Sequence, residues 1–206
     1  MSEKQENIEN NQKSKKGKLV ALIIIALIAI VLLVVGIVLA INANTPKSNV
    51  KIETTEDMEN LINTVYEGLE QSLPGSLMTQ AIDASDVNMV TAYTGLTSNE
   101  NIDSIVASEP MMSSQAYSFV LVKVKDGVDA NEIAKEMSEK VDTRKWICVE
   151  AEKLYATSVD NLAVLVMAND EWATPVYNKL LEVLGAHDEE YTKENTEAIN
   201  DQEFIG

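Results

Sequence analysis

The sequence predicts an α+β protein, in which an N-terminal transmembrane helix precedes a two-layer α/β sandwich. The expected order is α-α-β-β-α-β-β-α, with a mostly antiparallel four-stranded sheet. Three observations lead to this fold class. Residues 19–41 contain no charged, amide or hydroxyl side chain. After residue 101, strand patterns alternate with helical patterns, and short turns join neighbouring strands. The only cysteine, Cys148, excludes an intramolecular disulfide, so the fold must rest on its hydrophobic core.

The apolar run at residues 19–41 is long enough to cross a bilayer. Its 23 residues span about 34 Å as a helix, and a hydrocarbon core is about 30 Å thick. Lysines crowd its N-terminal boundary, whereas only Lys47 and Lys51 follow closely after it. Because positive residues are retained on the cytoplasmic side, we expect residues 1–18 to be a cytoplasmic tail and the bulk of the chain to lie outside the cell membrane.

A cleaved signal peptide is the alternative, because small residues at Ala40 or Ala43 follow the basic and apolar segments. The apolar region of a signal peptide has about 7–15 residues, whereas this run has 23. We therefore expect an uncleaved signal anchor. No cysteine follows the run closely, which excludes a lipoprotein-type anchor.

Composition divides the remaining chain into three parts. Residues 42–53 contain proline, asparagine and serine, as linkers do, and residues 54–187 form the predicted extracytoplasmic domain. Residues 188–206 carry seven acids against one lysine, which is typical of a disordered acidic tail. From residue 42 onward, 11 Lys and Arg face 30 Asp and Glu, a formal charge of −19. This surface repels nucleic acid and suits a basic partner or cations, unless its acidity serves solubility alone.

The domain should begin with two helices. In the first helix, apolar residues recur at helical spacing: Met58, Leu61, Ile62, Val65 and Leu69. Thr54 or Thr55 can cap it, and the chain breaks at residues 73–76, which include proline and glycine. A weaker helix follows at Val87–Tyr93, with Gly95 placed for a left-handed C-terminal cap.

The next unit is a hairpin followed by a helix. Strands are predicted at Ile102–Ala107 and Tyr117–Lys125, joined by a loop at Ser108–Ser114. Asp126-Gly127 signals a turn, and Asp129 begins a capping-box pattern. The helix that follows buries one face: Ile133, Ala134, Met137 and Val141.

The last unit repeats this order. We predict a strand at Lys153–Ser158, a turn at Asp160-Asn161 and a second strand at Leu162–Ala168. That second strand is apolar at every position, which fits an interior strand covered on both faces. Thr174-Pro175 then predicts the start of a helix that ends at Gly185.

No catalytic, cofactor-binding or metal-ligating set is predicted. The single histidine, His187, lies at the border of the acidic tail, so a Cys148–His187 dyad is a formal alternative to a buried structural thiol. One histidine and one cysteine cannot form a zinc site without several carboxylates, and no calcium loop or phosphate-binding glycine loop is present. A serine–lysine pair has no motif to support it.

Three apolar residues lie where loops are normally polar. Met111 and Met112 follow Pro110 at the predicted hairpin tip, and Trp172 precedes the final helix. Methionine adapts to irregular partners and tryptophan is enriched at binding hot spots. They are the candidate partner-binding residues; the alternative is that they fold back onto the core.

Four segments between residues 87 and 183 resemble a family of extracytoplasmic domains of unknown function from membrane-anchored proteins and lipoproteins of Gram-positive bacteria. The resemblance rests on Tyr93–Leu96, on Met111–Ser113 before a hydrophobic strand, on Val124–Gly127, and on the helix after it. It implies a cell-surface domain and brings no catalytic residues. This chain differs from the lipoprotein members in its helical anchor.

The function predicted is a single-pass membrane-anchored binding or interaction module with a protein or cell-envelope partner, in envelope assembly or sensing. Two alternatives stay open. Paired carboxylates can cleave glycosides when a cleft holds them about 5–9.5 Å apart, and the anchor could serve a transmembrane signalling subunit through a partner helix. The ligand and the oligomeric state are not encoded in any motif.

Overall fold

The computed structural model describes residues 29–33, 47–112 and 114–195. The chain divides into two units, one ending at Thr45 and one beginning at Pro46. Of the first unit only residues 29–33 are described, and they are helical. No helix within the described ranges is both long and apolar enough to cross a membrane. Most of the predicted span at 19–41, and all of the predicted tail at 1–18, lie outside those ranges.

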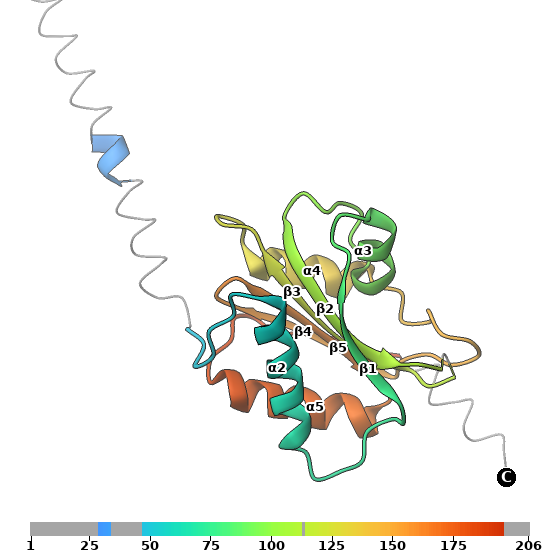
Figure 1. Ribbon diagram of the computed structural model, residues 1–206. Helices are drawn as coiled ribbons and strands as arrows, with labels where there is room; N and C mark the ends of the chain where they lie inside the picture. The colour runs from blue at the N-terminus through green and yellow to red at the C-terminus, as the bar shows by residue number, and fades with distance from the viewer. Residues whose placement is uncertain (1–28, 34–46, 113, 196–206) are drawn as a thin grey trace, which may run out of the picture. The chain divides into compact units, whose positions relative to one another are not determined.

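The second unit contains four helices and six strands among its described residues (Figure 1). In chain order they are α2 (Thr55–Glu67), β1 (Leu77–Ile82), α3 (Val87–Thr94), β2 (Ile102–Pro110), β3 (Tyr117–Val124), α4 (Ala130–Lys140), β4 (Lys153–Val159), β5 (Leu162–Ala168), α5 (Asp170–Leu184) and β6 (Tyr191–Glu194). The predicted order of helices and hairpins is present, with one strand added after the first helix and one after the last.

The strands form one antiparallel sheet in the order β1-β2-β3-β5-β4-β6. The α+β class and the two predicted hairpins, β2–β3 and β4–β5, are confirmed. The prediction of four strands is wrong because it omits both edges. Leu77–Ile82 has a weak strand pattern, with Thr79 and Gln80 at its centre, and it is fixed by pairing with β2.

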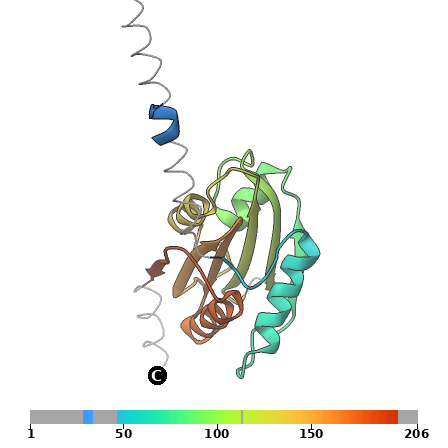
Figure 2. The same ribbon diagram turned by 90° about the vertical axis from the view of Figure 1, so that its left-hand side faces the viewer.

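Helices cover both faces of the sheet, so the predicted two layers are three (Figure 2). Neighbouring residues of β3 show this, because Val120 packs in one core with α3 and α4, whereas Phe119 packs in the other with α2 and α5. Every residue of β5 is buried, as predicted for an interior strand. Of the first two helices of the domain, α2 lies on one face and α3 on the other. The order of elements alone does not reveal this arrangement.

The predicted disordered tail is wrong for residues 188–195. Asp188 N donates to Ser158 O at 2.8 Å, and Ser158 Oγ donates to Asp188 Oδ2 at 2.6 Å. β6 then pairs with β4 from Ala156↔Tyr191 to Lys153↔Glu194. Backbone pairing to an open strand edge orders this segment despite its acidic composition. Residues 196–206 lie outside the described ranges.

The second half of the predicted linker at 42–53 is part of the domain. Asn49 N donates to Leu184 O at 2.8 Å, and Ser48 N donates to Asp160 Oδ2 at 3.0 Å. Ile52 is buried in the core beneath α2 and α5. We call residues 47–53 the docked segment. Its alternating apolar residues bind it to the domain, where composition alone predicts a free linker.

Candidate functional site

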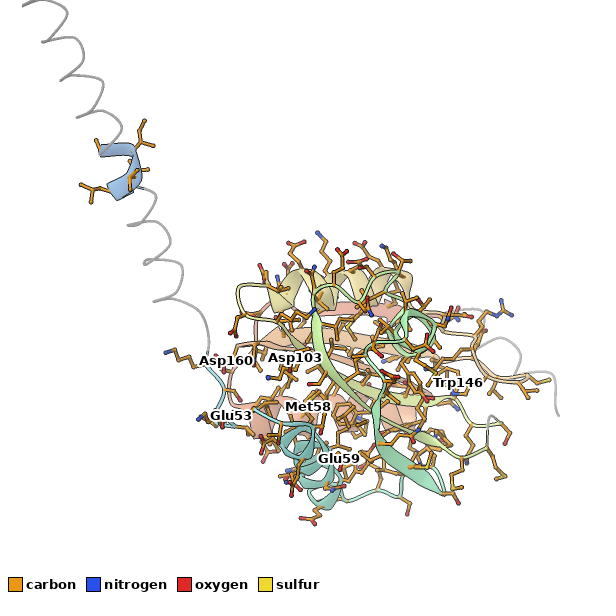
Figure 3. The ribbon with its side chains drawn as sticks, turned by 45° about the horizontal axis from the view of Figure 1, so that its top comes forward. Glu53, Met58, Glu59, Asp103, Trp146 and Asp160 are labelled. Carbon is orange, nitrogen blue, oxygen red and sulfur yellow. The ribbon has the colours of Figure 1, made fainter. Side chains whose placement is uncertain are left out.

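The strand register places the loops in two groups, at opposite ends of the sheet. Tyr117 begins β3 and Lys153 begins β4, and both pair with Ala168, the last residue of β5. The β2–β3 connection, the loop before β4 and the start of α5 therefore share one end. Trp146 lies at this end and Asp160, in the β4–β5 turn, lies at the other (Figure 3). The docked segment joins the domain at the Asp160 end.

The three most exposed large apolar side chains among the described residues of the domain lie at the Trp146 end of the sheet. Met111 and Met112 in the β2–β3 connection are 70% and 63% exposed, and Ile147 in the loop before β4 is 68% exposed. Met111 N donates to Ser76 O at 3.1 Å, which holds the connection beside the start of β1. The two methionines therefore do not fold back onto the core. We call this surface, Met111 with Met112 and Ile147, the methionine end.

Trp172 has a different environment from the methionines. It lies in the first turn of α5, where it is partly buried against the core beneath α2 and α5. The helix begins at Asp170 and not at the predicted Thr174, because Glu152 Oε2 accepts from Asp170 N at 2.8 Å and Thr174 Oγ1 donates to Asp170 Oδ1 at 2.5 Å. Pro175 therefore lies inside the helix, where it removes one backbone hydrogen bond, and not at its first position. Trp172 is thus chiefly a packing residue.

A half-buried polar cluster at the methionine end was missed by sequence reasoning. Lys145 Nζ lies 2.5 Å from Glu109 Oε1 and 3.4 Å from Ser118 Oγ, and Ser118 donates to the same glutamate oxygen at 2.6 Å. The side chains of Lys145 and Glu109 are only 16% and 22% exposed. Lys145 Nζ also lies 5.1 Å from the ring centroid of Tyr93. We call Lys145, Glu109 and Ser118 the Lys145 clamp.

The hydrogen bonds of the Lys145 clamp suit a residue set that positions a loop, and do not suit a catalytic serine–lysine pair. In a serine–lysine catalytic pair the lysine must accept the serine proton. Here Lys145 Nζ donates to Glu109, and the Ser118 hydroxyl gives its hydrogen to Glu109 while its side chain is fully buried. The ion pair therefore fixes the loop before β4 to the ends of β2 and β3. No local pattern marks it, because the three residues come from three separate elements.

The formal Cys148–His187 dyad is not assembled. Cys148 is exposed in the loop before β4, and is not the buried thiol expected as its alternative. His187 follows α5, and the next residue pairs with Ser158 near the far end of β4. The seven residues of β4 separate the two side chains by about 20 Å, at about 3.3 Å per residue. His187 Nδ1 instead lies 2.8 Å from Asp188 O.

A shallow cavity of about 250 Å³ lies at the opposite end, between the docked segment and the β4–β5 turn. Its lining includes Ile52, Glu53, Val159, Asp160 and Leu162. Within the described residues, no group of three or more His, Cys, Asp or Glu side chains could hold a metal ion. The buried polar residues of those ranges are all serine or threonine, so the structure adds no support for catalysis by paired carboxylates.

Buried tyrosine hydroxyls join α2 to the sheet. Tyr117 donates to Tyr66 Oη at 3.0 Å. Burial raises the pKa of Tyr66 to about 12, and burial also raises the pKa of Tyr117 well above its ordinary value. Both phenols are therefore neutral at physiological pH, and they act as a structural bond.

Comparison of the chain with protein-family models, with curated proteins and with solved structures gave no match. The resemblance to extracytoplasmic domains of Gram-positive bacteria therefore stays a prediction, and function must be argued from the residues of the chain.

Proposed function

We propose that this protein is a single-pass membrane-anchored extracytoplasmic binding module, and that the methionine end contacts a protein partner outside the cell membrane. The observation that carries the proposal is the exposure of Met111, Met112 and Ile147, each more than 60% exposed, on loops at one end of the sheet. Connecting loops are usually polar, and a group of large exposed apolar side chains is a feature of interaction surfaces.

The energetics of these side chains favour a partner. Burying a methionine or isoleucine side chain that is otherwise exposed contributes about 1.5–3 kcal/mol. Methionine also adapts its shape to the surface that it meets. The Lys145 clamp fixes the loop that carries Ile147, so less conformational entropy is lost when a partner binds.

The anchoring part of the proposal rests on the sequence. The apolar run at 19–41 and the preceding lysines favour a span with its N-terminus in the cytoplasm. The domain after this span carries the acidic surface, which suits a partner with a basic rim.

The test is crosslinking of the full-length chain in its native membranes with a membrane-impermeant reagent. We expect one reproducible crosslinked partner species with the wild-type chain. The double substitution Met111→Lys with Met112→Lys should lower its yield at least fivefold, because two charges would enter an apolar contact.

A matched control is the pair Val87→Lys with Met89→Lys, because these residues are 40% and 37% exposed on α3 and are not among the three residues of the methionine end. The control should retain the wild-type yield. An equal yield from the methionine variant and the control would overturn the proposed surface. So would a wild-type chain that gives no defined species.

A further inference from the structure

The two edges of the sheet differ in a way that indicates different uses. β6, at one edge, has only four residues, and Lys193 and Glu194 place charges on it. β1, at the other edge, has six residues, Leu-Met-Thr-Gln-Ala-Ile, without a charge or a proline. Proteins block open edges with short strands, charges, proline or bulges, because an unblocked edge pairs with another strand. β6 is blocked in this manner, and β1 is not.

The edge strand β1 is exposed in part, although its last residue, Ile82, is buried. Met78 is 43% exposed and Ala81 is exposed, while Thr79 and Gln80 are half-buried. β1 pairs with β2 on one side only, in a continuous register from Leu77↔Pro110 to Ile82↔Ile105. Its other side presents a row of backbone donors and acceptors for a further strand.

We propose that β1 pairs antiparallel with β1 of a second copy of this chain, which joins two six-stranded sheets into one. The symmetry fixes the geometry of this pairing. A two-fold axis perpendicular to the sheet keeps each face of one copy continuous with the same face of the other. Paired residues must then point to the same face, so the central residue is either Thr79 or Gln80, each opposite itself.

Charge permits a second copy at this edge, whereas it opposes one over most of the surface. The chain has a formal charge of −17, so most contacts between two copies would bring acid to acid. β1 itself has no charge, and the nearest carboxylate beyond it, Asp83, would lie opposite Gly75 in the register centred on Thr79. In the register centred on Gln80 it would lie opposite Leu77. Neither register places two like charges across from each other.

The pairing should be weak in dilute solution and effective on a membrane. A six-residue strand pair is small, and two-stranded contacts are marginal in water. A shared membrane raises the effective concentration of two tethered copies without any new contact. This inference rests on the proposed membrane anchor, but not on the partner proposed for the methionine end, because the β1 edge involves none of its three residues.

Symmetric cysteine crosslinking of the full-length chain in membranes tests the pairing. In a Cys148→Ser background, Thr79→Cys and Gln80→Cys are each oxidised with copper phenanthroline, and the covalent dimer is measured on non-reducing gels. Because each residue would face its own copy at the axis, at least one variant should form a dimer at five times the yield of the control or more. The control is Thr192→Cys on the β6 edge. Two variants are needed because Thr79→Cys also removes a bond from Thr79 Oγ1 to Ser108 Oγ.

A second substitution separates strand pairing from chance collision. Ala81→Lys, added to the crosslinking variant, places a charge on the edge and should lower the dimer yield at least fivefold, with an unchanged circular dichroism spectrum. The proposal is overturned if both cysteine variants crosslink no better than Thr192→Cys, or if Ala81→Lys leaves their dimer yield unchanged.

Discussion

The ammonium nitrogen of Lys145 lies 2.5 Å from Oε1 of Glu109, although the two residues are 36 positions apart in the chain. This ion pair joins the loop before β4 to the end of β2, just before the β2–β3 connection. It thereby links the two loops whose apolar side chains are exposed at the methionine end. The pair is more sheltered than a surface salt bridge, since each side chain is less than a quarter exposed.

Lys145→Met should loosen the loop before β4. The substitution keeps most of the apolar stem and removes the ammonium, so Glu109 loses its charged partner, and we expect a loss of about 1–3 kcal/mol in the free energy of unfolding. Hydrogen exchange of residues 141–152 should accelerate more than exchange in β5. Glu109→Gln combined with Lys145→Met should cost less than the sum of the single changes, because no unpaired charge remains. Unchanged exchange in the loop would contradict the clamp.

Gly95→Ala should be strongly destabilising. Gly95 has φ +77°, and a Cβ there would lie 2.4 Å from the backbone nitrogen of Val141. We expect a loss of about 2–4 kcal/mol, measured by urea unfolding, because both the left-handed backbone and the contact with α4 oppose alanine.

Two other glycines separate these causes. Gly127 has φ +80° with open space around it, so Gly127→Ala should cost only about 1 kcal/mol. Gly75 has open space and no positive φ, so Gly75→Ala should change stability by less than about 0.5 kcal/mol. Equal losses at Gly95 and Gly127 would show that the close approach to α4 carries no cost.

Tyr66→Phe should reduce the fall in the free energy of unfolding that occurs as pH rises above 10. The pKa of Tyr66 is raised from 10.0 to about 12 by burial, so above pH 10 the unfolded chain releases this proton before the folded chain does. The stability that the neutral phenol contributes is therefore full below pH 10 and is lost as pH rises toward 12. The stability difference between wild type and Tyr66→Phe should shrink by about 1 kcal/mol between pH 8 and pH 11. A constant difference in urea unfolding across that range would contradict this prediction.

Cys148 is a natural reporter of membrane topology, because it is the only cysteine and is exposed. If the domain lies outside, a membrane-impermeant maleimide should label Cys148 in intact cells. A Ser2→Cys chain in the Cys148→Ser background should be labelled only after lysis. The reverse pattern would overturn the predicted orientation, and loss of the Ser2→Cys site from the mature chain would indicate cleavage.

Local patterns predicted the elements whose signals lie within a few residues. Thr54 caps α2 as predicted, and Asp129 caps α4, although the full capping box forms at α2 and not at α4. Gly95 and Gly185 take left-handed caps after α3 and α5. Lys140 pairs with Glu136 one turn away, at the i and i+4 spacing that lets two helical side chains meet. Such features depend on contacts along one helix or across one turn, so the order of residues is sufficient to reveal them.

The start of α5 could not be predicted from local patterns. Thr174-Pro175 is a strong local start signal, yet the helix begins at Asp170 because Glu152 and Lys153, from another part of the chain, bind Asp170. Only part of the candidate surface was predicted, because local patterns reveal its methionines but not Ile147. The exposure of Met111 and Met112 follows from their place at a hairpin tip, whereas Ile147 joins them through the Lys145 clamp.

The sequence by itself determined the apolar run, the acidic charge of the remaining chain, the two hairpins and the helices packed beside them. Only the tertiary structure decided that helices cover both faces, that β1 and β6 form the edges, and that residues 47–53 and 188–195 belong to the domain. The physical reason is that edge strands and docked segments owe their order to distant partners, as Leu77 does to Pro110 and Asn49 to Leu184. Their own apolar patterns are too short to specify a structure without those partners.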